Sequence, residues 1–422
     1  MTKRLYNARI ITMLRDEDII EGDIHIDGNR ITYVGSAKPG TFDEEIDCEG
    51  NVLLPGFKNA HTHSGMTAFR SLADDLNLQD WLFKEIFPRE DKMTGEDIFW
   101  LSKLAFLEYL TSGITACADM YLTPETIAEA AEQFGMRCQL VSGFNKYSGP
   151  IDIVEKRFNE LNGRNPLTGF LMGLHAEYTC DRSTLEAMSE LLHKYKAPLY
   201  THMSETKTEH EECKGRYGKT PMAIFDELGL WDFGGCIYHG VWVEDSDMDI
   251  MKKRGIRVVS NPGSNTKLAS GIAPITKYLQ KGIEVALGTD GASSNNCLDF
   301  FREMFLVTGL AKLRDNDPKA VDAYEVLKMA CVNSSHAMGL FDNDALAPGK
   351  LADIVMIDLR QPNMQPLLNI RKNIVYSGSK SNVKMTMVDG KILYRDGRFC
   401  SDINTDEIYD RCNEITARLK DI

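Results

Sequence analysis

Pro55-Gly56-Phe57-Lys58-Asn59-Ala60-His61-Thr62-His63 is an apolar stretch that ends in two histidines one residue apart. We interpret it as the end of a buried strand over residues 52–63. Because alternate residues of a strand point to the same side, His61 and His63 direct two imidazoles at one point. Two imidazoles supply half of a coordination shell for a divalent metal ion. The other half must come from elsewhere in the chain.

Short apolar runs alternate with amphipathic stretches across residues 56–345. Thr94 with Asp97 is a helix-starting pair, and Gly113 suits a helix end. Strands that alternate with helices indicate βα units and a parallel sheet, so the pattern predicts an α/β fold, a (β/α)8 TIM-type barrel. The eight expected strands lie at 52–63, 114–120, 137–143, 170–175, 198–204, 236–241, 256–261 and 284–290.

The two ends of the chain resemble each other more than they resemble the middle. Residues 1–55 and 346–422 are rich in short strands, with Asp-Gly turns at Asp27-Gly28 and Asp389-Gly390 that are typical of hairpins. A helix is expected near the C-terminus, from Thr405 to Lys420. We expect the two ends to form one small β-sandwich beside the barrel.

Composition excludes several classes of partner. The formal net charge of −14 disfavours nucleic acid and anionic membranes, which require basic patches. No run of about 18 apolar residues would span a membrane, and the N-terminus does not resemble a signal peptide. The 10 cysteines are scattered, as expected for reduced thiols in a cytoplasmic protein. Whether the chain forms a homodimer or a homotetramer stays open.

Polar residues follow the apolar runs at the positions where strands should end. In a barrel these strand ends meet on one face, where catalytic groups lie. A single histidine in such a position is more often structural than functional, but five of the 9 histidines fall there. Of the other four histidines, His25 alternates with isoleucines in an expected strand and is given no chemical role, while His193, His210 and His336 lie in expected helices and are interpreted as packing or surface residues. The strand-end set is His61, His63, His175, His202, His239 and Asp290.

Imidazoles with one carboxylate suit Zn²⁺ or Fe²⁺ better than Mg²⁺ or Ca²⁺, which prefer oxygen ligands. A bound divalent ion lowers the pKa of water to about 7 and so supplies a nucleophile for hydrolysis. Glu205 follows His202 by three residues and is the natural general acid and base. The alternative for Glu205 is a solvated carboxylate in a loop.

Several segments together resemble the amidohydrolase superfamily, and within it the 5-methylthioadenosine/S-adenosylhomocysteine deaminase branch, with triazine hydrolases and guanine deaminases nearby. The resemblance covers nearly the whole chain. The segments are PGFKNAHTHSGM (55–66), TSGITACADMY (111–121), HMSET (202–206), NPGSNTKLASGIAP (261–274) and GTDGASSNN (288–296).

The resemblance implies one divalent ion, zinc or alternatively ferrous iron, bound by His61, His63, His202 and Asp290. It also implies that Glu205 protonates the purine N1 while water attacks C6. Asp290 would accept a proton from that water, and His239 would orient it. The product would be the inosine analogue and ammonia.

Substrate contacts are also implied by the resemblance. Glu90 would accept hydrogen bonds from both ribose hydroxyls, a task that suits a carboxylate. His175 would contact the nucleoside near its sugar or base. Trp81 would line the base or 5′ pocket, although an aromatic there is equally a plain wall.

One departure from the family concerns the 5′ group. Relatives that accept S-adenosylhomocysteine carry an arginine where this chain has Ser142, and a second arginine is not evident around residues 148–150. Each lost hydrogen bond to a charged group costs about 1.5–3 kcal/mol, and Lys146 would compensate only in part. We therefore expect a neutral 5′ group, as in methylthioadenosine, 5′-deoxyadenosine or adenosine.

Two other functions remain as alternatives. The same site could act on a free base or a chloro- or amino-triazine, but Glu90 favours a substrate with a ribose. A non-catalytic scaffold is the remote alternative, because such proteins lose metal ligands. The zinc signature of cytidine deaminases is absent.

Overall fold

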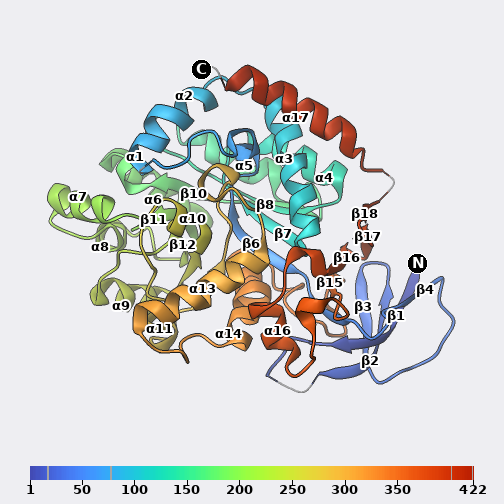
Figure 1. Cartoon of the computed structure of the whole chain (residues 1–422). Helices are drawn as coiled ribbons and strands as arrows, with labels where there is room; N and C mark the ends of the chain where they lie inside the picture. Colours follow the sequence, from blue (N-terminus) through green and yellow to red (C-terminus); the bar gives the residue numbers. More distant parts are fainter. Residues whose placement is uncertain (17–18, 77, 401, 421) are drawn as a thin grey trace.

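Strands from both ends of the chain form one mixed sheet. The computed structural model describes residues 1–16, 19–76, 78–400, 402–420 and 422 (Figure 1). The sheet has the order β18-β17-β16-β15-β5-β1-β2-β3, and β4 pairs with β1. Its strands are β1 (Thr2–Ile10), β2 (Ile20–Asp27), β3 (Arg30–Gly35), β4 (Glu44–Asp47), β5 (Val52–Pro55), β15 (Ile354–Ile357), β16 (Val383–Val388), β17 (Lys391–Arg395) and β18 (Arg398–Phe399).

Two parallel sheets occupy the middle of the chain, which confirms the α/β class. The first has the order β6-β7-β8-β9 and the second β10-β11-β12-β13-β14. The strands are β6 (Phe57–Thr62), β7 (Ile114–Asp119), β8 (Arg137–Val141), β9 (Thr168–Leu171), β10 (Gly173–Ala176), β11 (Leu199–Met203), β12 (Gly235–His239), β13 (Ile256–Ser260) and β14 (Val285–Leu287).

Backbone hydrogen bonds link these two sheets at both of their edges. The N–H of His175 donates to the carbonyl of Phe144 at 2.9 Å, beside the short connection between β9 and β10. On the other side, the N–H of Asp290 donates to the carbonyl of His61 at 3.0 Å. The last and the first parallel strand therefore lie next to each other where they end.

Two of the expected strands were wrong in their extent, because each divides between two sheets. Residues 52–63 form β5 in the terminal sheet and β6 in the parallel sheet. The division falls at Gly56, where a Cβ would lie only 2.1 Å from a side-chain atom of Thr115. Residues 170–175 divide in the same way between β9 and β10, at Met172.

Helices cover the parallel sheets. The Thr94–Asp97 capping box begins α3 as expected, and Asp181 caps α6. The helix expected from about Gly218 to Leu228 is confirmed as α8, and a further helix, α7, precedes it and ends at Tyr217 with Gly218 as its C-cap. The longer helices are α3 (Gly95–Thr111), α4 (Pro124–Phe134), α5 (Asp152–Leu161), α6 (Arg182–Tyr195), α7 (Lys207–Tyr217), α8 (Pro221–Glu227), α9 (Asp245–Arg254), α13 (Phe300–Asp315), α16 (Ile370–Tyr376) and α17 (Thr405–Leu419).

Shorter helices connect the strands and border the strand ends. They are α1 (Leu78–Asp80), α2 (Phe87–Glu90), α10 (Pro262–Lys267), α11 (Ile275–Gln280), α12 (Ala292–Asn295), α14 (Ala323–Lys328) and α15 (Ser334–Ala337), with 3-10 or π turns at Ser64–Phe69, Trp81–Ile86, Glu177–Thr179, Met329–Asn333, Pro362–Met364 and Lys380–Asn382. The C-terminal helix α17 lies across α3 (Figure 1), and Arg418 pairs with Asp97 at 2.5 Å.

The main apolar core lies between the parallel sheets and their helices, while a second core lies on one face of the terminal sheet. All six residues of β6 are buried, so the histidine stretch is an interior strand. In the part of the chain that the structure describes, no helix is long and apolar enough to cross a membrane. All ten cysteines are free thiols.

Candidate metal centre and active site

Four metal-ligating side chains meet where three parallel strands end. His61 lies near the end of β6 and His63 directly follows that strand, while His202 lies near the end of β11 and Asp290 follows β14. One ligand atom from each of the four lies within 4.8 Å of every other, and all four residues are buried. The site therefore assembles residues that are up to 229 positions apart in the chain, as 290 minus 61 shows.

The distances suit a single small cation. His202 Nε2 lies 3.1 Å from His61 Nε2 and 3.3 Å from His63 Nε2. Asp290 Oδ1 lies 3.4 Å and 3.1 Å from the same two nitrogens. Ligands bound tetrahedrally to zinc at about 2.0–2.1 Å are separated by about 3.3 Å. A divalent ion placed between these three imidazole nitrogens would bind all of them.

The outer atoms of these ligands are held by the protein, as is usual in metal sites. His202 Nδ1 donates to the carbonyl of His175 at 2.7 Å, and His63 Nδ1 donates to the carbonyl of Met120. Asp290 Oδ2 accepts hydrogen bonds from the hydroxyls of Ser264 and Ser294, both at 2.7 Å. Hydrogen bonds thus orient three of the four ligands, whereas His61 Nδ1 is buried with no partner among the described residues and its ring stacks on Tyr238.

The protonation states also favour metal binding. Burial lowers the pKa of His61 to about 3 and, together with neighbouring imidazoles, places the pKa of His202 well below its usual value. Burial alone would raise the pKa of Asp290, but hydrogen bonds from His61 and His63 hold it well below its usual range. Neutral imidazoles and an ionised carboxylate are the forms that bind a metal ion, and His61, His202 and Asp290 are in these forms. At His63 burial alone would lower the pKa, but the contact with Asp290 raises it, so binding of a metal ion would displace a proton there.

The chain turns sharply after three of the strands that carry the site. Ser204, His239 and Asp290 have φ angles of 54°, 71° and 61°, in the left-handed region that residues other than glycine rarely adopt. Backbone strain of this kind is concentrated at functional sites, where the surrounding structure maintains it. It turns the side chains of these segments towards the metal site.

Glu205 and His239 lie beside the four ligands. His239 Nε2 is 3.7 Å from Glu205 Oε2, and the hydroxyl of Ser270 donates to Glu205 Oε1 at 3.4 Å. Burial raises the pKa of Glu205, although the charge of His239 opposes the shift. A buried carboxyl with a raised pKa retains a proton at higher pH and can act as a general acid.

A cavity of about 440 Å³ opens onto these groups. It contains the other four sequence-predicted residues, Trp81, Glu90, Ser142 and His175. Glu90 is buried, and burial raises its pKa to about 6, although the neighbouring Tyr121 hydroxyl opposes the shift. Its Oε1 atom has no hydrogen-bond partner among the residues that the structure describes. An unpaired buried carboxylate oxygen in a cavity indicates a missing ligand.

The structure adds residues that the sequence did not identify. Arg157, on α5, lines the outer part of the cavity, so this wall does contain an arginine. Its Nε and Nη2 atoms donate to both carboxylate oxygens of Glu125, at 2.7 Å and 3.3 Å. Lys146, the expected substitute, is exposed and is not among the lining residues. Because Arg157 lies outside the family segments, no local signal marked it.

Curated relatives match almost the full length of the chain. It is 40% identical over 403 residues to a 5′-deoxyadenosine deaminase of Methanosarcina mazei, covering 93% of this chain and 92% of the relative. It is 40% identical over 384 residues to a 5-methylthioadenosine/S-adenosylhomocysteine deaminase of Thermococcus sibiricus, covering 89% and 90%.

A solved structure has the same fold. The crystal structure of an adenosine deaminase from Xanthomonas campestris with bound zinc aligns with a TM-score of 0.93 at 26% identity, covering 100% of this chain and 99% of that one. The model of the amidohydrolase family matches residues 52–393, which include both histidines of the opening stretch and the other two ligands. With its metal ligands in place and relatives of this kind along its length, the chain belongs to the amidohydrolase family.

Proposed function

We propose that the protein is a metal-dependent hydrolytic deaminase that converts a 6-aminopurine nucleoside to the inosine analogue and ammonia. The observation that carries the proposal is the juxtaposition of the four ligands, Glu205 and the unpaired Oε1 atom of Glu90 around one cavity. The relatives named as deaminases of such nucleosides, at 40% identity, support the same reaction.

The side chains around the cavity have separate tasks in this reaction. The four ligands would hold a divalent ion, zinc or ferrous iron, which would supply a water molecule that is acidic near neutral pH. Glu205 carries the proton that goes to the purine N1. Asp290 accepts a proton from the attacking water, and His239 orients that water. The C6–oxygen bond would form and the C6–nitrogen bond would break. The proton held by Asp290 would pass to the leaving amino group as ammonia departs, and the remaining proton of the former water would return to Glu205.

Glu90 is proposed to select a substrate with a ribose. Its carboxylate can accept two hydrogen bonds, which matches the vicinal hydroxyls of a nucleoside. His175 and Trp81 lie in the same cavity and are proposed to contact the sugar and to line the wall. A free base would leave Glu90 buried and unpaired, which costs about 1–3 kcal/mol or more for a charged group.

The 5′ end of the nucleoside is proposed to be neutral. Ser142 offers no charge, and the one arginine among the described lining residues, Arg157, is already paired with Glu125. A carboxylate on the substrate would have to compete with Glu125 for this guanidinium. Methylthioadenosine, 5′-deoxyadenosine and adenosine avoid this competition.

A series of substrates tests both the deaminase reaction and the preference for a neutral 5′ group. We expect ammonia from all three neutral nucleosides, with a higher kcat/KM for 5′-methylthioadenosine than for S-adenosylhomocysteine. A clear preference for S-adenosylhomocysteine would refute the neutral 5′ group and leave the deaminase intact. If the protein releases ammonia from guanine or a triazine but not from any nucleoside, the result would favour the free-base alternative. No turnover of any compound by metal-loaded protein would favour the scaffold.

We further propose that the two parallel sheets form a single (β/α)8 barrel over residues 56–345. The hydrogen bonds that join β14 to β6 and the segments around β9 and β10 support closure. Residues 1–55 and 346–422 would then form a separate β-sandwich domain with the terminal helix. The cytoplasmic location and the choice between a homodimer and a homotetramer stay predictions.

A further inference from the structure

Asn265 contacts a residue of the active site but belongs to neither the ligands nor the cavity wall described above. His239 Nδ1 lies 2.8 Å from Asn265 Oδ1, and both side chains are buried. Asn265 lies on α10, within the segment NPGSNTK. The preceding residue on that helix, Ser264, donates to Asp290. One short helix therefore supports two groups of the reaction.

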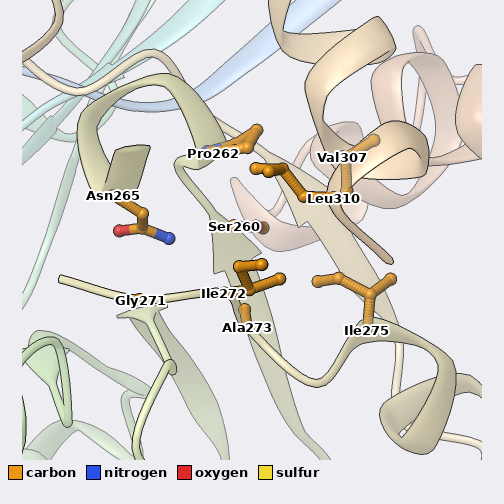
Figure 2. A pocket seen from close by; sticks show the side chains of 9 residues that line it. All are labelled: Ser260, Pro262, Asn265, Gly271, Ile272, Ala273, Ile275, Val307 and Leu310. Carbon is orange, nitrogen blue, oxygen red and sulfur yellow. The ribbon is translucent and has the colours of Figure 1, made fainter. Parts of the chain in front are cut away.

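The other end of the Asn265 amide faces a small cavity behind the active site. Figure 2 shows Asn265 at one side of this cavity, with its nitrogen directed towards it. The cavity has a volume of about 10 Å³, enough for roughly one water molecule. Asn265 Nδ2 is buried and has no partner among the described residues. The amide thus presents its oxygen to His239 and its nitrogen to a space of water size.

The position of Asn265 is fixed by a second buried group, Glu303 on α13. Its carboxylate accepts hydrogen bonds from the N–H of Gly263 and from Asn295 Nδ2, both at 2.8 Å. A Cβ at Gly263 would lie 2.4 Å from Glu303 Oε1, so the helix and the carboxylate are in close contact. The backbone of Asn265 is also bonded, since its carbonyl accepts from the N–H of Ser270 at 2.9 Å.

The chemistry of the contact determines which nitrogen of His239 carries the hydrogen. An amide oxygen only accepts, so Nδ1 must be the donor. In a neutral imidazole the other nitrogen, Nε2, then has a free lone pair. Nε2 is the atom that faces Glu205 at 3.7 Å, on the side of the reacting groups.

We propose that Asn265 is a positioning residue that holds His239 in the Nδ1–H tautomer, so that Nε2 can accept a hydrogen bond from the attacking water. The kinetic consequence rests on the proposed deaminase function. The tautomer itself does not, because the hydrogen bond is formed by the protein alone.

Nitrogen NMR of the histidine side chains tests the tautomer directly, on protein with and without metal. In the natural sequence we expect His239 with hydrogen on Nδ1. Asn265→Ala should shift the signal towards the other tautomer, and Asn265→Asp, which keeps an accepting oxygen, should retain the Nδ1–H form. Hydrogen on Nε2 in the natural protein would overturn the proposal, whether or not the protein is a deaminase.

Kinetics supply the second readout. Asn265→Ala should lower kcat by about ten- to hundredfold, as is typical for groups that orient an active-site histidine, with little change in KM. Asn265→Asp should recover part of this loss. The matched control is Asn333→Ala, which removes a buried asparagine bonded to the carbonyl of Val285 at 2.9 Å. An equal loss of kcat in the control, or an unchanged kcat and tautomer in Asn265→Ala, would refute the positioning role.

Discussion

Two buried polar clusters lie at opposite ends of strand β6, which contributes a residue to each. Lys58 lies near the start of β6, in a cluster with Arg137, Asp353 and Asp389 that we call the lower cluster. His61 lies near the end of β6, in the metal centre. In the lower cluster Arg137 Nε lies 2.9 Å from Asp353, and Arg137 Nη2 lies 2.9 Å from Asp389. Lys58 Nζ donates to the carbonyl of Gly56 at 2.6 Å.

The difference between the clusters is whether the protein itself satisfies its polar atoms. In the lower cluster the cations face carboxylates and carbonyls, and the contacts join the parallel sheets to the terminal sheet. In the metal centre imidazole nitrogens face one another, which is favourable only around a cation. The amino ends of barrel strands typically serve stability, and the carboxyl ends serve chemistry. Substitutions in the two clusters should therefore have separable effects.

The largest effect is expected at Glu205. Glu205→Gln removes the proton that goes to the purine, so kcat should fall by about 10²–10⁴-fold, the usual contribution of a general acid. The thermal midpoint and the metal content should stay unchanged, because Glu205 is not a ligand. Steady-state kinetics with metal analysis on the same sample provide the check. Loss of metal together with activity would mean that Glu205 acts as a ligand.

The opposite result is expected in the lower cluster. Asp353→Asn leaves Arg137 buried with only part of its partner charge, which should lower the free energy of unfolding by about 3–5 kcal/mol. Urea unfolding measures this loss, and kcat of the folded protein should be unaffected. A large fall in kcat without loss of stability would show that the two clusters are coupled.

The Asp353 carboxylate also makes the stability of the protein depend on pH. Burial alone would raise the pKa of Asp353, but the charge of Arg137 holds it below its usual range. A lowered folded pKa stabilises the protein fully above the unfolded pKa of about 3.9, and this stability is lost as the pH falls through the folded pKa. Asp353→Asn should therefore flatten the acid limb of the stability profile.

A smaller effect on substrate affinity is expected at Glu90. Glu90→Gln weakens the bonds to the ribose hydroxyls, so kcat/KM should fall by about ten- to 150-fold, mostly through KM. Since burial raises the pKa of Glu90 to about 6, KM in the unsubstituted protein should rise as the pH falls below that value. A Glu90→Gln enzyme that retains nucleoside turnover and this pH response would contradict the ribose assignment.

The smallest effect is expected at the exposed pair on the cavity rim. Glu125→Gln frees Arg157, and because exposed ion pairs contribute only about 0.2–1 kcal/mol, kcat/KM for S-adenosylhomocysteine should rise by no more than about fivefold. Turnover of 5′-methylthioadenosine serves as the internal control and should not change. An equal rise in kcat/KM for both substrates would mean that the substitution acts on the cavity rim in general and not on the charged 5′ group.

The strand-end positions in the sequence indicated six candidate residues, and the resemblance to the amidohydrolase superfamily implied which four of them are the metal ligands. It did not predict Arg157 or Asn265 as functional residues, because their roles depend on contacts with Glu125 and His239 that only tertiary packing creates. The division of residues 52–63 at Gly56 was missed for a related reason. Both halves are apolar and extended, and the Pro55-Gly56 step between them is the one local sign that the strand divides between two sheets.

The helix α7 was missed because its sequence, KTEHEECKGRY, has no apolar stripe. Its formation depends on capping, since Thr206 accepts a hydrogen bond from the N–H of Glu209 at 3.2 Å. The Glu209 carboxylate in turn accepts from the N–H groups of Ser204 and Glu205, both at 2.8 Å. This contact between a helix and a strand end is tertiary, and a periodic pattern does not reveal it.

The central claim is that His61, His63, His202 and Asp290 hold one divalent ion that the release of the C6 amino group requires. The most direct test is the ammonia released from 5′-methylthioadenosine by metal-loaded protein, by protein stripped with a chelator, and after metal is restored. We predict one ion per chain, one ammonia per nucleoside consumed, loss of activity on stripping and its return on reloading. Full activity in protein shown to be free of metal, or consumption of the nucleoside without ammonia, would contradict the account.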